Sequence, residues 1–285
     1  MLFGTYRFLL QQDSPLREQL PLSWPIGICV RWEDLSSNRS GLLINARSAA
    51  RASVRAEPSS RSTVGRVDLQ PVIDSFEPLT RRAEWFIAAR CVRVECPQLE
   101  EYRDPWLEIG LPATQVDRVV EFQRRWGGLV LPPSLDYEGG PKMLRADMPG
   151  GALQRIGWFE AGTQRVSMAC EFMIGPAGEF GIDGDRWVPL HASIEGWIES
   201  LALADHAACN AKQINTIRGD EIDELPVSAF EPVTEIRGLA DTWWRGPDSL
   251  IAIYTGEAEC FGAPRLRVAR VYAGLDKWGL SGWGR

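Results

Sequence analysis

Residues 178–204 constrain the fold more than any other stretch of the chain. Phe180 and Ile182 alternate towards one side of a strand, and the dipeptide Asp183-Gly184 that follows is typical of a tight β-hairpin turn. After the return strand, Ser193 can cap a helix with one apolar stripe. The members of that stripe follow i, i+3, i+4, i+7 spacing: Ile194, Trp197, Ile198 and Leu201. The stretch therefore predicts a hairpin that runs directly into an amphipathic helix.

The region upstream of this hairpin predicts further helices and strands. Residues 98–109 are expected to be helical unless Pro105 breaks them. A second helix is expected to begin at a capping box of Thr114 and Asp117 and to end at Gly127-Gly128. Strands are expected within residues 129–131, 156–160 and 165–174.

Both ends of the chain are expected to be β-rich extensions. In the N-terminal part, residues 83–94 are dense in aromatic and β-branched residues, which favours a strand. In the C-terminal part, residues 211–225 are polar and acidic and predict a solvated loop, followed by strands at 250–254 and 266–272.

Residues 39–66 form a basic segment, with six arginines against Glu57. A mobile surface loop is the favoured interpretation, because the segment is rich in Ser and Ala. A basic arm for nucleic acid or for an acidic partner is the alternative. The segment contains no aromatic residue, which argues against single-strand binding by base stacking.

The composition limits the partners and the compartment. A net charge of −7 and a pI near 5.1 disfavour a nucleic-acid complex and favour a basic protein partner. No apolar run approaches the roughly 18 residues of a transmembrane helix, so no membrane association is expected. The six cysteines form no C-x-x-C pair, which is typical of free thiols in a reducing compartment. We therefore expect a cytoplasmic protein.

The sequence offers little for catalysis, cofactors or metal. The two histidines, His191 and His206, are too few for a standard zinc site without distant cysteines or carboxylates. His206 and Cys209 lie three residues apart on the expected helix, but a reactive dyad also needs an orienting group and an oxyanion hole. Asp183 and Asp185 are interpreted as turn formers. No nucleotide-binding or hydrolase motif occurs, so no catalytic, cofactor or metal residues are predicted.

Twelve tryptophans are the unusual feature of the composition. Most are expected in the core, because each indole contributes a large apolar area when it is buried. An exposed tryptophan beside carboxylates would suit a basic protein partner, and the alternative is that these residues also line the core. The candidate partner-binding residues are Trp158, Glu160, Asp183, Asp185 and Trp187.

The central order of elements resembles the SUKH superfamily of bacterial toxin-immunity proteins. The resemblance covers about residues 98–208. It is carried by Leu111-Pro112, Trp126-Gly127-Gly128, Phe180-Gly181-Ile182-Asp183 and the helix start at residues 192–198. It implies an α+β domain over residues 98–210, with an antiparallel sheet and flanking helices. The β-rich extensions are then residues 1–97 and 211–285.

What the resemblance implies about function is binding. Members of the superfamily protect the producing cell by docking onto a cognate toxin, often a nuclease or a deaminase, and masking its active site. No catalytic residue comes with the family. We therefore expect a non-catalytic immunity protein with a basic toxin as partner. Two alternatives stay open: an intracellular scaffold or regulatory module that binds a host protein or small ligand, and a hydrolase with an unfamiliar site.

Overall fold

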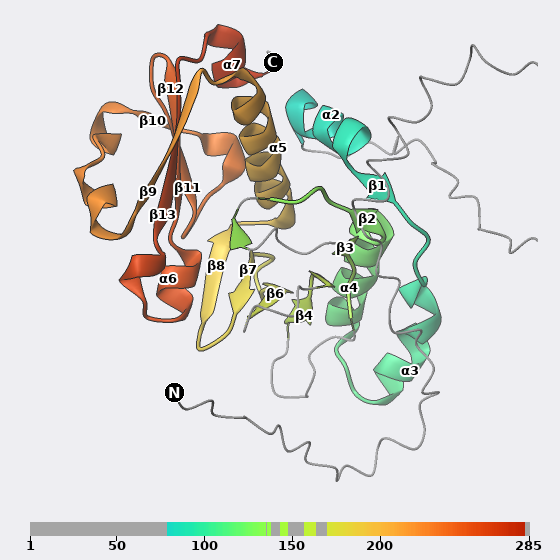
Figure 1. Cartoon of the computed structure of the whole chain (residues 1–285). Coiled ribbons are helices and arrows are strands. Elements are labelled where there is room, and N and C mark those ends of the chain that lie inside the picture. The colour runs from blue at the N-terminus through green and yellow to red at the C-terminus, as the bar shows by residue number, and fades with distance from the viewer. Residues whose placement is uncertain (1–78, 135, 138–142, 148–156, 164–169, 283–285) are drawn as a thin grey trace, which may run out of the picture. The chain divides into compact units, whose positions relative to one another are not determined.

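A computed structural model of the chain describes residues 79–134, 136–137, 143–147, 157–163 and 170–282 (Figure 1). The basic segment 39–66 and most of the expected N-terminal extension lie outside these residues. The described residues belong to one compact unit, residues 65–285. They combine helices with three small antiparallel sheets, so the predicted α+β class is confirmed. In this part of the chain no helix is both long and apolar enough to cross a membrane.

The predicted hairpin is confirmed and forms part of a four-stranded sheet, which we call the hairpin sheet. Asp183 lies opposite Trp187, and Ile182 lies opposite Val188. The strand order is β4-β6-β7-β8, and all neighbours are antiparallel. The strands are β4 (Phe159–Glu160), β6 (Glu171–Ile174), β7 (Phe180–Asp183) and β8 (Trp187–His191).

A second small sheet is joined to the hairpin sheet through Ala161. The amide N–H of Ala161 donates to the carbonyl of Phe172 in β6, and its own carbonyl accepts from the N–H of Arg145. The order of this sheet is β1-β2-β3-β5. Its strands are β1 (Val92–Arg93), β2 (Leu129–Val130), β3 (Met143–Leu144) and β5 (Gly162–Thr163).

Helix α4 (Ala113–Trp126) ends at Gly127 as predicted, but its start differs. The predicted capping box is wrong, because the helix begins directly after Pro112 and no side chain caps it. Asp117 instead accepts a hydrogen bond from Arg103. The helical prediction for residues 98–109 is confirmed as the 3-10 turn η3 (Leu99–Tyr102) and helix α3 (Arg103–Glu108). Pro105 does not break α3, because it lies in the first turn, where its missing N–H has no intrahelical partner.

The N-terminal part of the described chain is helical where a strand was expected. Residues 83–94 do not form one strand, because α2 runs from Arg81 to Arg90 and only Val92–Arg93 pair in a sheet. Thr80 caps the helix by accepting a hydrogen bond from the amide of Ala83. Ala83, Phe86 and Ile87 are buried, and their i, i+3, i+4 spacing gives α2 one apolar face. The expected β-rich extension 1–97 is therefore corrected over this segment.

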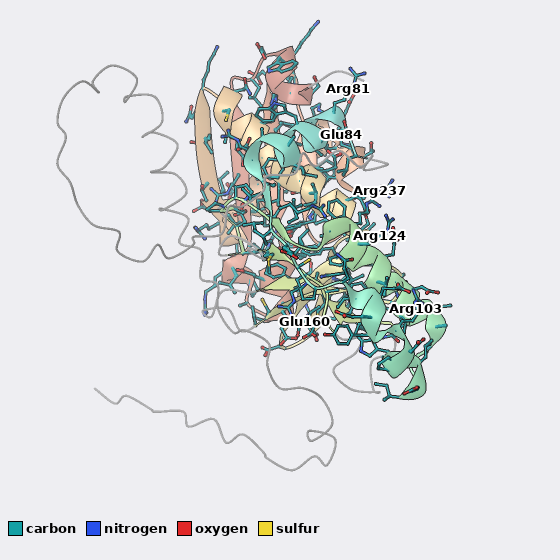
Figure 2. The ribbon with its side chains drawn as sticks, turned by 90° about the vertical axis from the view of Figure 1, so that its right-hand side faces the viewer. Arg81, Glu84, Arg103, Arg124, Glu160 and Arg237 are labelled. Carbon is teal, nitrogen blue, oxygen red and sulfur yellow. The ribbon has the colours of Figure 1, made fainter. Side chains whose placement is uncertain are left out.

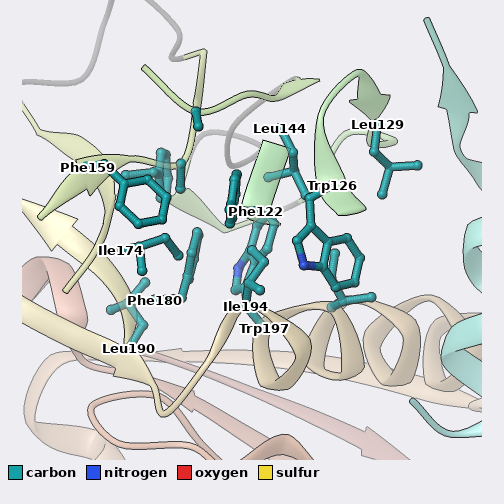
Figure 3. Close-up of a cluster of buried hydrophobic side chains, with 14 of the residues drawn as sticks. Phe122, Trp126, Leu129, Leu144, Phe159, Ile174, Phe180, Leu190, Ile194 and Trp197 are labelled. Carbon is teal, nitrogen blue, oxygen red and sulfur yellow. The ribbon is translucent and has the colours of Figure 1, made fainter. Parts of the chain in front are cut away.

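Helix α5 (Ile194–Asn210) follows the hairpin and confirms the predicted helix, with the Ser193 hydroxyl capping the amide of Gly196. Its N-terminal half packs in a first hydrophobic core against α4 and the inner face of the hairpin sheet (Figure 3). The Trp197 and Phe180 rings stack there with centroids 4.5 Å apart. Its C-terminal half contributes Leu203 and Ala207 to a second core.

The second core is covered by a five-stranded antiparallel sheet of order β10-β11-β12-β13-β9. The loop predicted for residues 211–225 is wrong, because β9 pairs with β13 along its whole length before the 3-10 turn η5 (Gly219–Glu224) begins. The strands are β9 (Gln213–Arg218), β10 (Glu231–Pro232), β11 (Thr242–Arg245), β12 (Ser249–Tyr254) and β13 (Val268–Ala273). The shorter connections contain η6 (Val227–Ala229), η7 (Thr234–Ile236), α6 (Gly256–Cys260), η8 (Pro264–Leu266) and α7 (Lys277–Ser281).

A buried ion pair joins α2, α5 and α7. The Arg82 guanidinium lies 3.1 Å from the Glu199 carboxylate, and each side chain is only 3% exposed. Arg82 also donates to the carbonyl of Ser281, at 3.0 Å. The backbone N–H and the hydroxyl of Thr80 donate to the same carboxylate, so Glu199 has several partners despite its burial. Arg82 also lies 3.6 Å from the Glu235 carboxylate. Removal of Glu199 would leave the buried Arg82 with only this longer ion pair, and removal of Arg82 would leave the Glu199 carboxylate buried without its cation.

Glu199→Ala is therefore expected to lower the free energy of unfolding by about 3–5 kcal/mol, measured by urea denaturation. Glu195→Ala is the matched control, because Glu195 lies on the same helix and pairs with Arg125 at a more exposed site. The control is expected to cost at most about 1 kcal/mol. Equal costs for the two variants would contradict the role assigned to Glu199.

Candidate functional site

The outward face of the hairpin sheet carries four of the five residues predicted to bind a partner. The inward-pointing residues of this sheet lie in the first core: Phe159, Phe172, Ile174, Phe180, Ile182, Val188 and Leu190. By alternation, Glu160, Asp183 and Trp187 point outward, as does Trp158 immediately before β4. Asp185 is exposed in the turn between β7 and β8. Figure 2 shows Glu160 well separated from Arg81 and Glu84 of α2. We call the outward face of the hairpin sheet, with Trp158, Glu160, Asp183 and Trp187, the tryptophan face.

Trp158 and Trp187 are in direct contact on this face. Their ring centroids are 4.6 Å apart, and the planes meet edge to face at 83°. Both side chains are partly buried and neither belongs to the first core. The alternative that these two tryptophans line the core is therefore wrong, although neither is fully exposed.

Two glycines allow the Trp187 indole to lie across the sheet. A Cβ atom at Gly181 would lie 2.7 Å from the ring and 2.3 Å from the carbonyl oxygen of Val188. A Cβ atom at Gly175 would lie 3.0 Å from the same ring. Because neither position has a side chain, the Trp187 ring of the aromatic pair can pack directly against the backbone of β7 and of the end of β6. A rigid, half-buried aromatic pair is the kind of anchor that protein interfaces use.

Carboxylates lie on the same sheet face as the aromatic pair. Burial raises the pKa of Glu160, and the charges of Asp147 and Glu171 raise it further, while Arg145 acts in the opposite direction. Glu171 also lies opposite Asp183 in the register of β6 and β7, so these two acids lie side by side on this face. Acidic groups beside an indole attract a Lys or Arg side chain through both charge and cation–π interaction. The tryptophan face therefore has the chemistry of a receptor for a basic protein surface.

Arg118 of α4 holds the backbone near Trp158 and was not singled out from the sequence. Its guanidinium donates to the carbonyls of Gly157 at 3.1 Å, Pro176 at 3.0 Å and Gly175 at 2.7 Å. It therefore connects the start of β4 with the turn after β6. No sequence pattern could have identified it, because all three acceptors are main-chain atoms of loops about 40 to 60 residues away.

A buried polar cluster lies at the junction of α5, the hairpin sheet and the five-stranded sheet. The Asp241 carboxylate accepts hydrogen bonds from the Tyr137 hydroxyl at 2.6 Å and from the backbone N–H groups of Thr255 and Gly256. His191 is fully buried, with Nδ1 3.3 Å from the Ile236 carbonyl oxygen. Its Nε2 has no partner among the described residues.

The space beside this cluster is too small for a substrate. It is a cavity of about 20 Å³, lined by Tyr137, His191 and Asp241 among others. Such a volume holds a single water molecule. Burial raises the pKa of Asp241 from 3.8 to about 7 and lowers that of His191 from 6.5 to about 3. The cluster is therefore a structural junction whose ionisation affects stability.

The other pair considered from the sequence is not assembled for chemistry. His206 Nε2 lies 2.9 Å from the carbonyl oxygen of Trp278, and Cys209 accepts a hydrogen bond from Arg90. Across the described residues, no group of three or more His, Cys, Asp or Glu side chains is placed to hold a metal ion. Among the residues that the structure describes, the tryptophan face is thus the strongest candidate site.

Comparison with protein-family models, with curated proteins and with solved structures found no match for this chain. The resemblance to the SUKH superfamily consequently stays a prediction that rests on the motifs of residues 98–208.

The buried cluster predicts a specific pH dependence of stability. The raised pKa of Asp241 stabilises the folded state fully below pH 3.8, and this contribution is lost as pH rises through about 7. The lowered pKa of His191 stabilises the folded state above pH 6.5, and this contribution is lost as pH falls through about 3. Between about pH 6.5 and 4 the two contributions therefore change in opposite directions.

Asp241→Asn removes the contribution of Asp241 to the pH dependence of stability and leaves that of His191. As pH falls from about 6.5 to 4.5, its free energy of unfolding should drop more steeply than that of the unmodified protein, by about 1.4 kcal/mol per pH unit. Urea denaturation at several pH values measures the difference. Asp248→Asn, at an exposed position, should run parallel to the unmodified protein. Parallel curves for Asp241→Asn as well would contradict the assignment.

Proposed function

We propose that this chain is a non-catalytic immunity protein that binds and neutralises a basic toxin domain through its tryptophan face. The observation that carries the proposal is the contact of Trp158 with Trp187 on a sheet face that also presents Glu160, Glu171 and Asp183. The resemblance of residues 98–208 to the SUKH superfamily supplies the class of partner. In that class the toxin is often a nuclease or a deaminase, whose binding site for nucleic acid favours positive charge.

The chemistry of the face supports binding more than turnover. The aromatic pair supplies apolar contact area, and the carboxylates supply attraction and orientation for cationic side chains of the partner. The polar cluster at Asp241 has room for one water molecule only. Occlusion of the toxin's active site by an acidic surface would require no reactive group on this chain. We further propose that the complex forms in the cytoplasm, where the toxin would otherwise act.

Co-purification with the product of the gene directly upstream tests the proposal, at low and at high salt. We expect a complex that weakens as salt rises, because the opposing charges are screened. The absence of a complex at both salt concentrations would overturn the proposal. That result would favour the second function considered above, a scaffold or regulatory module that binds a host protein or a small ligand.

Trp187→Ala should weaken this complex at least about tenfold, because truncation of a central aromatic anchor usually has a large effect on affinity. Calorimetry or surface plasmon resonance measures the change. Trp85→Ala is the matched control, since Trp85 is 45% exposed on α2, outside the tryptophan face. If both substitutions leave the affinity unchanged, the partner binds elsewhere.

Asp183→Asn combined with Asp185→Asn should reduce the salt dependence of the association rate. Asp185 is exposed and Asp183 is half-buried, and acids at the rim of an interface act mainly by steering the encounter of the two proteins. Stopped-flow measurements over a range of salt concentrations give the slope. Asp248→Asn should leave it unchanged, because this exposed residue lies in the turn between β11 and β12, outside the tryptophan face. An unchanged slope for the double variant would show that the acids of the hairpin turn do not contribute to the association rate.

A further inference from the structure

Within the part of the chain that the structure describes, the five-stranded sheet has one protected edge and one open edge. Strand β10 forms the first edge, and it is only two residues long and contains Pro232. Short length and proline are ordinary means of preventing edge-to-edge association. Strand β9 forms the other edge with six residues, and all of its residues except Ile217 are exposed. It contains no proline and no acidic residue.

The backbone groups at this open edge follow from the register of β9 with β13. The N–H of Gly219 donates to the carbonyl of Arg267 at 3.1 Å, so residue 219 lies at a hydrogen-bonded position of the ladder. Such positions alternate along an antiparallel pair, so the odd-numbered residues of β9 bond to β13. The N–H and C=O groups of Ile214, Thr216 and Arg218 accordingly point away from β13, at the free edge.

We propose that two copies of this chain associate by antiparallel pairing of their β9 strands, centred on Thr216. Thr216 then faces Thr216 of the second copy, and Ile214 faces Arg218. All three positions direct their backbone groups outward, so the pairing would form about six main-chain hydrogen bonds. Opposed threonines are a favourable cross-strand pair. The two sheets become one continuous ten-stranded sheet.

The charges at the two ends of β9 select this register. Lys212, just before the strand, lies beside Asp220 and Glu221 of the second copy, and all three residues are exposed. The same contact occurs twice because of the two-fold symmetry. A shift that centres the pair on Asn215 would instead place Lys212 opposite Arg218, where like charges repel. Charge complementarity thus favours the Thr216 register.

The association is expected to be weak, because strand pairing buries little apolar area. We expect a dissociation constant on the order of 10–100 µM, because the contact is smaller than a standard stable interface. Sedimentation velocity on the full chain, from roughly 5 to 500 µM, measures it. The weight-average sedimentation coefficient should rise towards the dimer value over this range. A monomer at every concentration would overturn the proposal.

Thr216→Pro tests the backbone contribution. Proline removes the outward N–H of residue 216 and leaves the ladder between β9 and β13 intact. We expect at least tenfold weaker association and an unchanged melting temperature. Thr216→Val, the matched control, keeps the N–H and loses only the hydroxyl, which accepts a hydrogen bond from Arg270 at 3.4 Å, so it should associate much more tightly than Thr216→Pro. Dimerisation of a folded Thr216→Pro variant at the original affinity would overturn the proposal.

A charge exchange tests the register without altering the strand. Lys212→Glu alone places like charges at both ends of the dimer. Asp220→Lys alone places a second cation beside Lys212 and leaves Glu221 as the one acid there. Each variant should therefore associate more weakly than the unmodified protein. An equimolar mixture of the two variants restores opposite charges at both ends and should dimerise. A mixture that stays monomeric while the unmodified protein dimerises would overturn the Thr216 register. The experiment concerns a different sheet from the tryptophan face, so its outcome is independent of the proposed function.

Discussion

The burial of helix α5 between two hydrophobic cores is the interaction on which the rest of the structure depends. Its first half completes the core of the hairpin sheet, and its second half completes that of the five-stranded sheet. A helix enclosed in this way also has to satisfy its polar side chains. Glu199 accepts hydrogen bonds from Thr80 and Arg82, and Ser200 accepts one from the Trp243 indole at 3.0 Å. The polar contacts of α5 therefore fix how α2 and β11 lie against it.

The candidate site depends on this core without belonging to it. Phe180 and Ile182 point inward and anchor β7 to α5, so the residues that alternate with them have to face outward. The position of Trp187 over Gly181 is thus a consequence of the same strand register that packs the first core. This arrangement lets the inner face determine stability while the outer face remains available for a partner.

Residues 178–204 could be predicted from the sequence because turn chemistry, strand alternation and helical spacing agree there. At helix α2 the sequence predicts a strand, because its dense apolar residues obscure the helical spacing of Ala83, Phe86 and Ile87. At strand β9 the sequence predicts a loop, because residues on both faces of the strand are exposed and no apolar alternation indicates a strand. Edge strands of this kind are defined by their neighbour, in this case β13, and not by their own composition.

The candidate site divides in the same way. Its five residues could be proposed from aromatic and acidic neighbours in the sequence, and four of them share one sheet face. The Arg118 contacts and the bond between Tyr137 and Asp241 could not, since they join loops far apart in the chain. A hydrogen bond requires a specific distance and angle between two groups, and no local sequence pattern shows that groups far apart in the chain will reach that geometry.

The shared helix also limits how this chain can be divided. Composition suggests a boundary near residue 210, yet a chain ending there would leave Leu203 and Ala207 facing water. The strands after residue 210 would in turn lose the surface that covers Trp243, Leu250 and Tyr272. Gene fusion, recombination or truncation at this point would produce two fragments that each expose half of a core. We therefore expect residues 79–282 to be inherited as one undivided unit.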